Sequence, residues 1–100
     1  MMLEKNKKIV LNGRDALEIL ANIEFMLISL HKMGSYYADK PVEDYRKSTT
    51  DFIDNEKITQ RLAEVRKMIT KNFDSTLGDD DMDDIERHLR KINFWTPKKV

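Results

Sequence analysis

The apolar run at residues 16–30, ALEILANIEFMLISL, limits the fold of this chain more than any other stretch. Eleven of its fifteen residues are apolar, and three of its four polar residues share one narrow helix stripe, because they recur at spacings of four and seven. These three are Glu18, Asn22 and Ser29. A helix that is apolar on nearly every side lies in the middle of a bundle or is covered by a partner. A chain of 100 residues has little other polypeptide to wrap such a helix, so we expect a homodimer with Phe25, Met26 and Ile28 in its interface.

The rest of the chain also has helical character. It is 36% charged and contains three glycines and two prolines, a composition that favours helices over sandwiches and barrels. Apolar residues recur three and four positions apart, which is the spacing of one helix face. We therefore predict an all-α fold, a small antiparallel bundle of three or four helices at about residues 14–33, 41–54, 55–73 and 79–93. We expect a single domain with a loose basic arm at residues 1–8, a short extended segment at residues 8–11 and a tail at residues 94–100.

Five aspartates fall within the six positions 79–84, DDDMDD. A calcium loop of the EF-hand kind needs a glycine at its sixth position and a glutamate at its twelfth, and the registers that start at Asp74 and at Asp79 have neither. The acids fit the first turn of a helix with Gly78 as its N-cap, because carboxylates there complement the positive end of the helix dipole. One or two acids are enough for that purpose. We therefore predict that the surplus forms an acidic surface for a basic partner, made of Asp79, Asp80 and Asp84.

Aromatic side chains are the second part of the predicted binding surface. Tyr36, Tyr37 and Trp95 are the candidate anchors, because aromatic residues contribute much of the binding energy of protein interfaces. The predicted function is a non-catalytic interaction protein, such as an adaptor, an inhibitor or an immunity-type regulator. Its charged helix face would meet another protein, and the acids would speed association more than they strengthen it.

A nucleic-acid-associated regulator is the alternative function. The end of the chain combines five basic residues with Phe94 and Trp95, and such a combination can hold phosphates and stack on bases. The basic residues are Arg87, Arg90, Lys91, Lys98 and Lys99. The acids immediately before them would repel the same phosphates, so this alternative ranks second.

The segment LHKMGS at residues 30–35 loosely resembles the motif of histidine phosphotransfer domains, which are four-helix bundles of similar length. The resemblance implies a phosphorylated histidine at His31. In this chain the glycine follows His31 by three positions instead of four, and Lys32 and Met33 stand in inverted order. The glycine notch is thereby displaced by about 100° around the helix, so phosphotransfer is a remote alternative.

The sequence contains no motif for catalysis, metal binding or disulfide formation. The chain has no cysteine, which excludes a disulfide framework, a thiolate metal site and a cysteine nucleophile. It also lacks a glycine-rich phosphate loop, a nucleophile elbow and a helical His-Glu metal motif. We therefore expect no enzymatic activity, no cofactor and no metal ion. The apolar run is shorter than the roughly 20 residues of a membrane span, and we expect a cytoplasmic protein.

Overall fold

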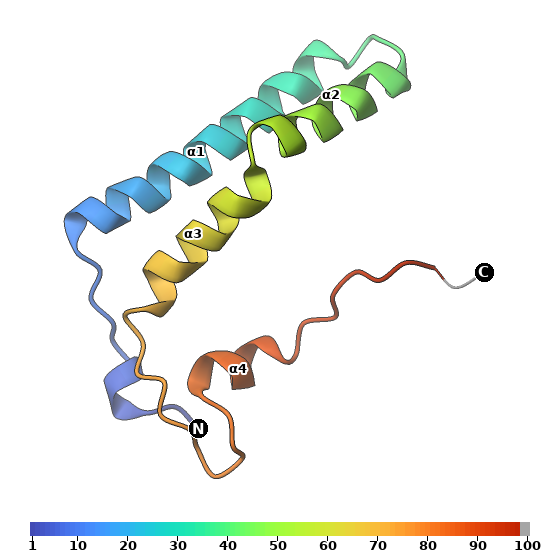
Figure 1. The fold of residues 1–100 in the computed structure, drawn as a ribbon. Helices are drawn as coiled ribbons and strands as arrows, with labels where there is room; N and C mark the ends of the chain where they lie inside the picture. Colours follow the sequence, from blue (N-terminus) through green and yellow to red (C-terminus); the bar gives the residue numbers. More distant parts are fainter. Residues whose placement is uncertain (99–100) are drawn as a thin grey trace. The chain divides into compact units, whose positions relative to one another are not determined.

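The computed structural model describes residues 1–98, and every regular element in this range is a helix (Figure 1). The elements are the 3-10 helix η1 (Glu4–Asn6) and the α-helices α1 (Gly13–Tyr36), α2 (Val42–Asn55), α3 (Ile58–Thr70) and α4 (Asp84–Leu89). The prediction of an all-α fold with a small helical bundle is confirmed. Residues 8–11, which the sequence suggests as a short extended segment, are irregular and pair with no strand in the described range.

The chain divides into two compact units. The helical unit is Leu11–Ile69, which contains α1, α2 and all but the last residue of α3. The terminal unit combines the first ten residues with the chain from Thr70 onward, and it contains η1 and α4. Residues 1–8, expected to be a loose arm, therefore include a helical turn and the buried side chain of Asn6.

The first helix of the helical unit begins with a side-chain cap. The Asn12 side chain accepts a hydrogen bond of 2.8 Å from the backbone N–H of Asp15, which satisfies one of the free donors of the first turn. At 24 residues, α1 is about 36 Å long. It continues three residues beyond its predicted end, because Gly34 keeps a negative φ and does not terminate the helix.

Aromatic and hydroxyl contacts attach α2 to α1. Figure 1 shows α2 running back along the second half of α1. The rings of Phe25 and Phe52 lie 5.6 Å apart, a distance typical of favourable aromatic pairs. The Ser48 hydroxyl lies 2.6 Å from that of Tyr37, to which it donates a hydrogen bond. The predicted antiparallel arrangement of these two helices follows from the short connection between them.

A left-handed residue separates α2 from α3. Lys57 has a φ of 52°, a left-handed backbone conformation that breaks the helix. Residues other than glycine rarely adopt it. The Arg61 side chain ties the start of α3 to the end of α2 and to α1. It donates hydrogen bonds to the Glu56 carbonyl (2.9 Å) and to the Asn22 side chain of α1 (3.2 Å). Its guanidinium also lies 4.4 Å from the centre of the Phe25 ring, within cation–π range.

The core of the helical unit is thin. Four apolar side chains of the described residues are less than a tenth exposed: Ile19 and Met26 of α1, and Ile58 and Val65 of α3. Each pair is seven residues apart, or two helical turns, so each helix turns one edge inward. Much of the apolar surface of these helices therefore remains in contact with solvent.

The last helix starts later than predicted. Asp83 is the N-cap of α4 and forms a capping box with Glu86, so the helix begins at Asp84 and not near Asp79. The residues before it form a turn in which the Gly78 N–H donates to the Met82 carbonyl at 2.8 Å. Asp81 has a φ of 63° in this turn, which is incompatible with a helix. The prediction that Gly78 caps the helix is wrong for this reason.

Candidate functional site

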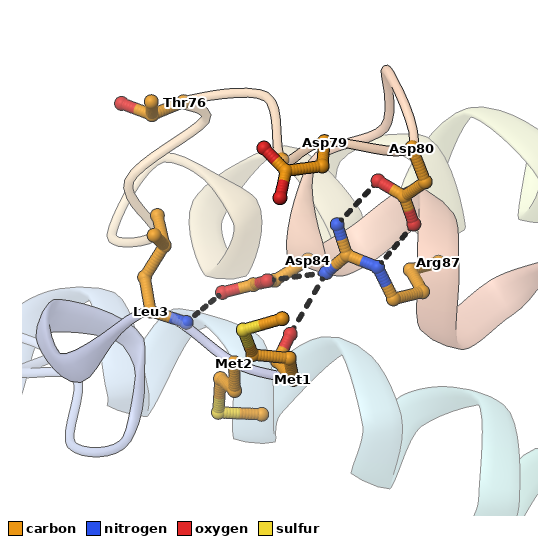
Figure 2. A pocket seen from close by; sticks show the side chains of 9 residues that line it. Met1, Met2, Leu3, Thr76, Asp79, Asp80, Asp84 and Arg87 are labelled. Atoms are coloured by element: carbon orange, nitrogen blue, oxygen red, sulfur yellow. Dashed lines mark hydrogen bonds and ion pairs between the residues drawn. The ribbon is translucent and has the colours of Figure 1, made fainter.

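Two acidic residues of the terminal unit hold one guanidinium, that of Arg87 (Figure 2). Asp80 receives two parallel hydrogen bonds, from Nε at 2.6 Å and from Nη2 at 2.8 Å. Asp84 receives a third, from Nη1 at 2.7 Å. The backbone carbonyls of Met82 and Met1 accept the remaining two, at 2.9 and 3.1 Å. A guanidinium has five N–H groups, so every donor of Arg87 has an acceptor within the protein.

The Asp84 carboxylate connects this arrangement to the start of the chain. Its second oxygen accepts hydrogen bonds from the backbone N–H of Leu3 at 2.9 Å and from the Asn6 side chain at 2.7 Å. Asn6 also exchanges two hydrogen bonds with the backbone of Asp74, at 2.7 and 2.9 Å. Asn6 and Asp84 are the two buried polar residues of the described chain, and each is fully hydrogen-bonded, as burial requires.

Ionisation in this cluster is shifted toward the charged forms. Hydrogen bonds from Asn6, from the Leu3 N–H and from Arg87 hold the pKa of Asp84 below its usual value. The paired hydrogen bonds from Arg87 hold the pKa of Asp80 well below its usual range. The pKa of Arg87 is raised in turn by Asp80 and Asp84. The three side chains therefore remain ionised together over the physiological pH range.

This geometry changes the meaning of the acidic run. Asp80 and Asp84 were predicted to face a partner, and both instead hold Arg87, with Asp84 buried. Arg87 was proposed as a nucleic-acid contact, yet its donors are already in use. Asp79 is the member of the predicted acidic surface that is exposed and free of Arg87. It borders a hollow of about 410 Å³ beside the side chain of Met2 (Figure 2).

Sequence reasoning missed the members of this cluster that lie at the other end of the chain. Leu3 and Asp84 are 81 residues apart, and Met1 and Arg87 are 86 apart. No local pattern around Asn6 distinguishes it from an ordinary polar residue in a basic arm.

The start of α4, by contrast, has a signal in the sequence. The Asp83–Glu86 spacing is a capping-box signature, and it could have placed the start of α4 correctly.

The other notable surface is an exposed apolar strip of α1 in the helical unit, next to the edge that the core covers. Four apolar residues at spacings of three, four and three are between 42% and 57% exposed, and we call them the α1 stripe: Leu20, Ile23, Leu27 and Leu30. The same helix buries Ile19 and Met26 on its inward side. One face of α1 is therefore used by the bundle, and a second apolar face is left uncovered among the described residues.

The predicted dimer residues fall on different sides of α1. Met26 is 8% exposed and belongs to the core, so it is not available to a partner. Phe25 is half-buried between Phe52 and Arg61. Ile28 is 44% exposed and lies on a different side of α1 from the α1 stripe, about 100° around the helix from Leu27. A helix that is apolar all round does not reveal from its sequence which side the bundle covers.

The predicted aromatic anchors also differ in their surroundings. Tyr37 is half-buried and hydrogen-bonded to Ser48. Tyr36 is 62% exposed, with the Lys40 ammonium 4.0 Å from its ring centre. Trp95 is 85% exposed in the irregular segment after α4. Tyr36 and Trp95 are thus accessible.

The basic residues proposed for nucleic acid are partly accessible. Arg90, Lys91 and Lys98 are exposed. Lys99 lies outside the described residues. His31 is exposed on α1, and His88 is exposed on α4.

No family model, curated protein or solved structure that was compared with this chain matches it. Within residues 1–98, no group of three or more histidine, aspartate or glutamate side chains is arranged to hold a metal ion. No helix in the same range is long and apolar enough to cross a membrane.

Proposed function

We propose that this protein is a non-catalytic binding module that associates with another polypeptide chain through the α1 stripe. The observation that carries the proposal is the exposure of Leu20, Ile23, Leu27 and Leu30 on a helix whose adjoining edge already forms the core. Contiguous exposed apolar surface on a small protein marks an interaction site more often than chance. Regular spacing of three and four residues is also how one helix presents itself to another.

The surroundings of the α1 stripe support a protein partner. Leu17, which is 67% exposed and lies one turn before Leu20, extends the apolar surface. Glu24 and His31 are the charged or titratable side chains at its edge. An apolar centre with a sparse polar rim is the usual composition of a protein interface. Tyr36, at the end of α1, is the exposed aromatic residue nearest to it along the helix.

The terminal unit contributes to the approach of a partner more than to the strength of binding in this proposal. Its acids hold Arg87 and stabilise the unit, and Asp79 is left as the acidic contact that can steer a basic partner. We therefore assign the main binding energy to the helical unit and not to the aspartate run.

Site-specific photocrosslinking in the cells that make the protein tests this function. A photoreactive residue in place of Leu27 (57% exposed) is compared with one in place of Leu62 (52% exposed), which lies on α3 outside the α1 stripe. We expect defined protein adducts from position 27 and few from position 62. Equal adduct formation at both positions, or none at either, would contradict the proposal.

A nucleic-acid role remains the second candidate, because Phe94 and Trp95 are exposed beside Arg90, Lys91 and Lys98. The protein has one tryptophan, so its fluorescence reports on this segment alone. Binding of single-stranded DNA or RNA through this segment would quench that fluorescence at low salt, and quenching would weaken as salt rises. Unchanged fluorescence at about 50 mM salt, where electrostatic binding is strong, would remove this candidate.

A further inference from the structure

We infer that the partner of the α1 stripe is a second copy of this chain, packed in the opposite direction against the same stripe. The inference rests on the proposed function, because it names the occupant of the same surface. It replaces the interface predicted from the sequence, since Met26 is in the core and Phe25 is packed against Phe52.

The order of residues along the α1 stripe makes it complementary to itself. Ala16, the four stripe residues and Gly34 follow one another at spacings of four, three, four, three and four. This series reads the same in both directions. A two-fold axis at its midpoint would place Leu20 opposite Leu30 of the second copy, and Ile23 opposite Leu27. At each end, Ala16 of one copy would meet Gly34 of the other, and their small size would let the helices approach closely. Each pair of residues would occur twice, which is the pattern of an isologous contact.

The spacing is also that of a coiled-coil seam. Alternating intervals of three and four residues keep apolar side chains on the side that faces a partner helix. From Ala16 to Gly34 the seam covers about 27 Å of helix. Its length corresponds to about two and a half heptads, which suits a reversible dimer better than a permanent one.

The charges on α1 favour the antiparallel direction. The first half of the helix carries three acids and one basic residue: Asp15, Glu18, Glu24 and Arg14. The second half carries His31 and Lys32 and no acid. Antiparallel copies bring unlike halves and opposite ends of the two helix dipoles together. Glu24 is the exception, because it lies one residue from the midpoint and would approach its own counterpart. Its exposure lets solvent and salt screen that repulsion.

The exposed area fits a transient dimer. The four stripe residues with Leu17 are on average about half exposed. At roughly 60–120 Å² of apolar area per leucine or isoleucine side chain, two copies would bury on the order of 300–600 Å² of apolar surface. Apolar atoms form a little over half of a typical interface, so this amount matches the small interfaces of transient complexes.

Sedimentation equilibrium of the full chain at concentrations of about 10 to 300 µM tests the inference, because this range covers a micromolar to submillimolar dissociation constant. We expect an average mass that rises with concentration from 11.8 kDa toward twice that value. Leu27→Asp should remain at 11.8 kDa, whereas the matched Leu62→Asp should associate like the unmodified chain. Circular dichroism of both variants establishes that α1–α3 are folded.

Cysteine pairing tests the direction of packing, and the absence of natural cysteine makes the result unambiguous. A mixture of Ile23→Cys and Leu27→Cys chains should form the mixed disulfide dimer in preference to either homodimer, because disulfides need Cα atoms about 5.5–6 Å apart. A preference for the two homodimers would overturn the antiparallel arrangement.

The two proposals can fail separately. A single species of 11.8 kDa at about 300 µM, together with adducts from position 27 to a different protein, would overturn the dimer and leave the proposed function standing. The same single species without adducts at position 27 would overturn both.

Discussion

At the scale of single residues, Arg87 organises the terminal unit. It is held by two carboxylates and two backbone carbonyls that come from the turn before α4, from α4 itself and from the start of the chain. Charge-assisted and bidentate hydrogen bonds are the strongest polar contacts available to a small unit of this kind. The acids of residues 79–84 are therefore explained mainly by what they hold together.

Removal of the buried carboxylate should loosen this unit. Asp84→Asn keeps the shape of the side chain and loses its charge, so Arg87 and the Leu3 N–H lose their ionised acceptor. We expect the Arg87 Nε–H signal in proton–nitrogen NMR spectra to broaden or exchange faster, and the unit to unfold at a temperature several degrees lower. Asp79→Asn is the matched control and should change neither quantity. Equal spectra for the two variants would mean that the cluster does not stabilise the unit.

The same cluster predicts a dependence on acid. The pKa values of Asp80 and Asp84 are lowered in the folded protein from an ordinary value of 3.8. Folding is therefore stabilised fully above pH 3.8, and that stabilisation is lost as the pH falls through the lower folded pKa values. An NMR titration should show the Arg87 Nε–H protected at pH 5 and lost well below pH 4. Loss of protection already between pH 5 and 7 would contradict this assignment of the carboxylates.

Residue-scale contacts of this kind were the least predictable from the sequence. Asn6, Leu3 and Asp84 are brought together over about 80 residues, and no periodic pattern records such a contact. The sequence shows a surplus of acids, but it does not show which side chains these acids contact in the folded protein. By contrast, the failure of the calcium-loop register could be read from the spacing alone.

At the scale of elements, α1 is a helix with two apolar faces. The buried face contributes Met26 to the core, and the neighbouring exposed face carries Leu27 in the α1 stripe. Helices α1, α2 and α3 were predictable because their apolar residues recur at local spacings of three and four. The side of α1 that the bundle covers was not predictable, since apolar residues occur around nearly the whole helix.

Alanine substitution should separate the two faces of α1. Met26→Ala removes a buried side chain and should lower the free energy of unfolding by about 2–4 kcal/mol. Leu27→Ala removes an exposed one and should change it by no more than about 0.5 kcal/mol at concentrations where the chain is monomeric. Denaturant titrations of the two variants at about 5 µM provide the comparison. Equal losses would mean that the two faces of α1 are assigned incorrectly.

The break between α2 and α3 offers a second test at this scale. Lys57 has a φ of 52°, which costs a side-chain-bearing residue about 1–2 kcal/mol, whereas glycine adopts it freely. After the larger backbone entropy of glycine in the unfolded chain is subtracted, Lys57→Gly should stabilise the helical unit by about 0.5–1 kcal/mol. Arg66→Gly, in the middle of α3, should destabilise it by about 1 kcal/mol. A loss of stability with Lys57→Gly would show that this break is not left-handed.

At the scale of the whole molecule, the helical unit has a thin core, which a partner on the α1 stripe would supplement. Four apolar side chains of α1 and α3 are buried, while the α1 stripe keeps an equal number exposed. The length of the apolar run predicts a partner for α1, and this partner remains a proposal. The proposed interface is placed on the α1 stripe and not at Phe25 and Met26, because Met26 is buried in the core and Phe25 is packed against Phe52.

The most direct measurement of the central claim is the thermal unfolding of the helical unit at two protein concentrations. A dimer that forms through the α1 stripe stabilises the folded state by mass action, so the midpoint should rise by several degrees between about 5 and 500 µM. Leu62→Asp should show the same rise, and Leu27→Asp should show none. A midpoint of the unmodified chain that is equal at both concentrations would contradict the claim that the α1 stripe binds a second copy.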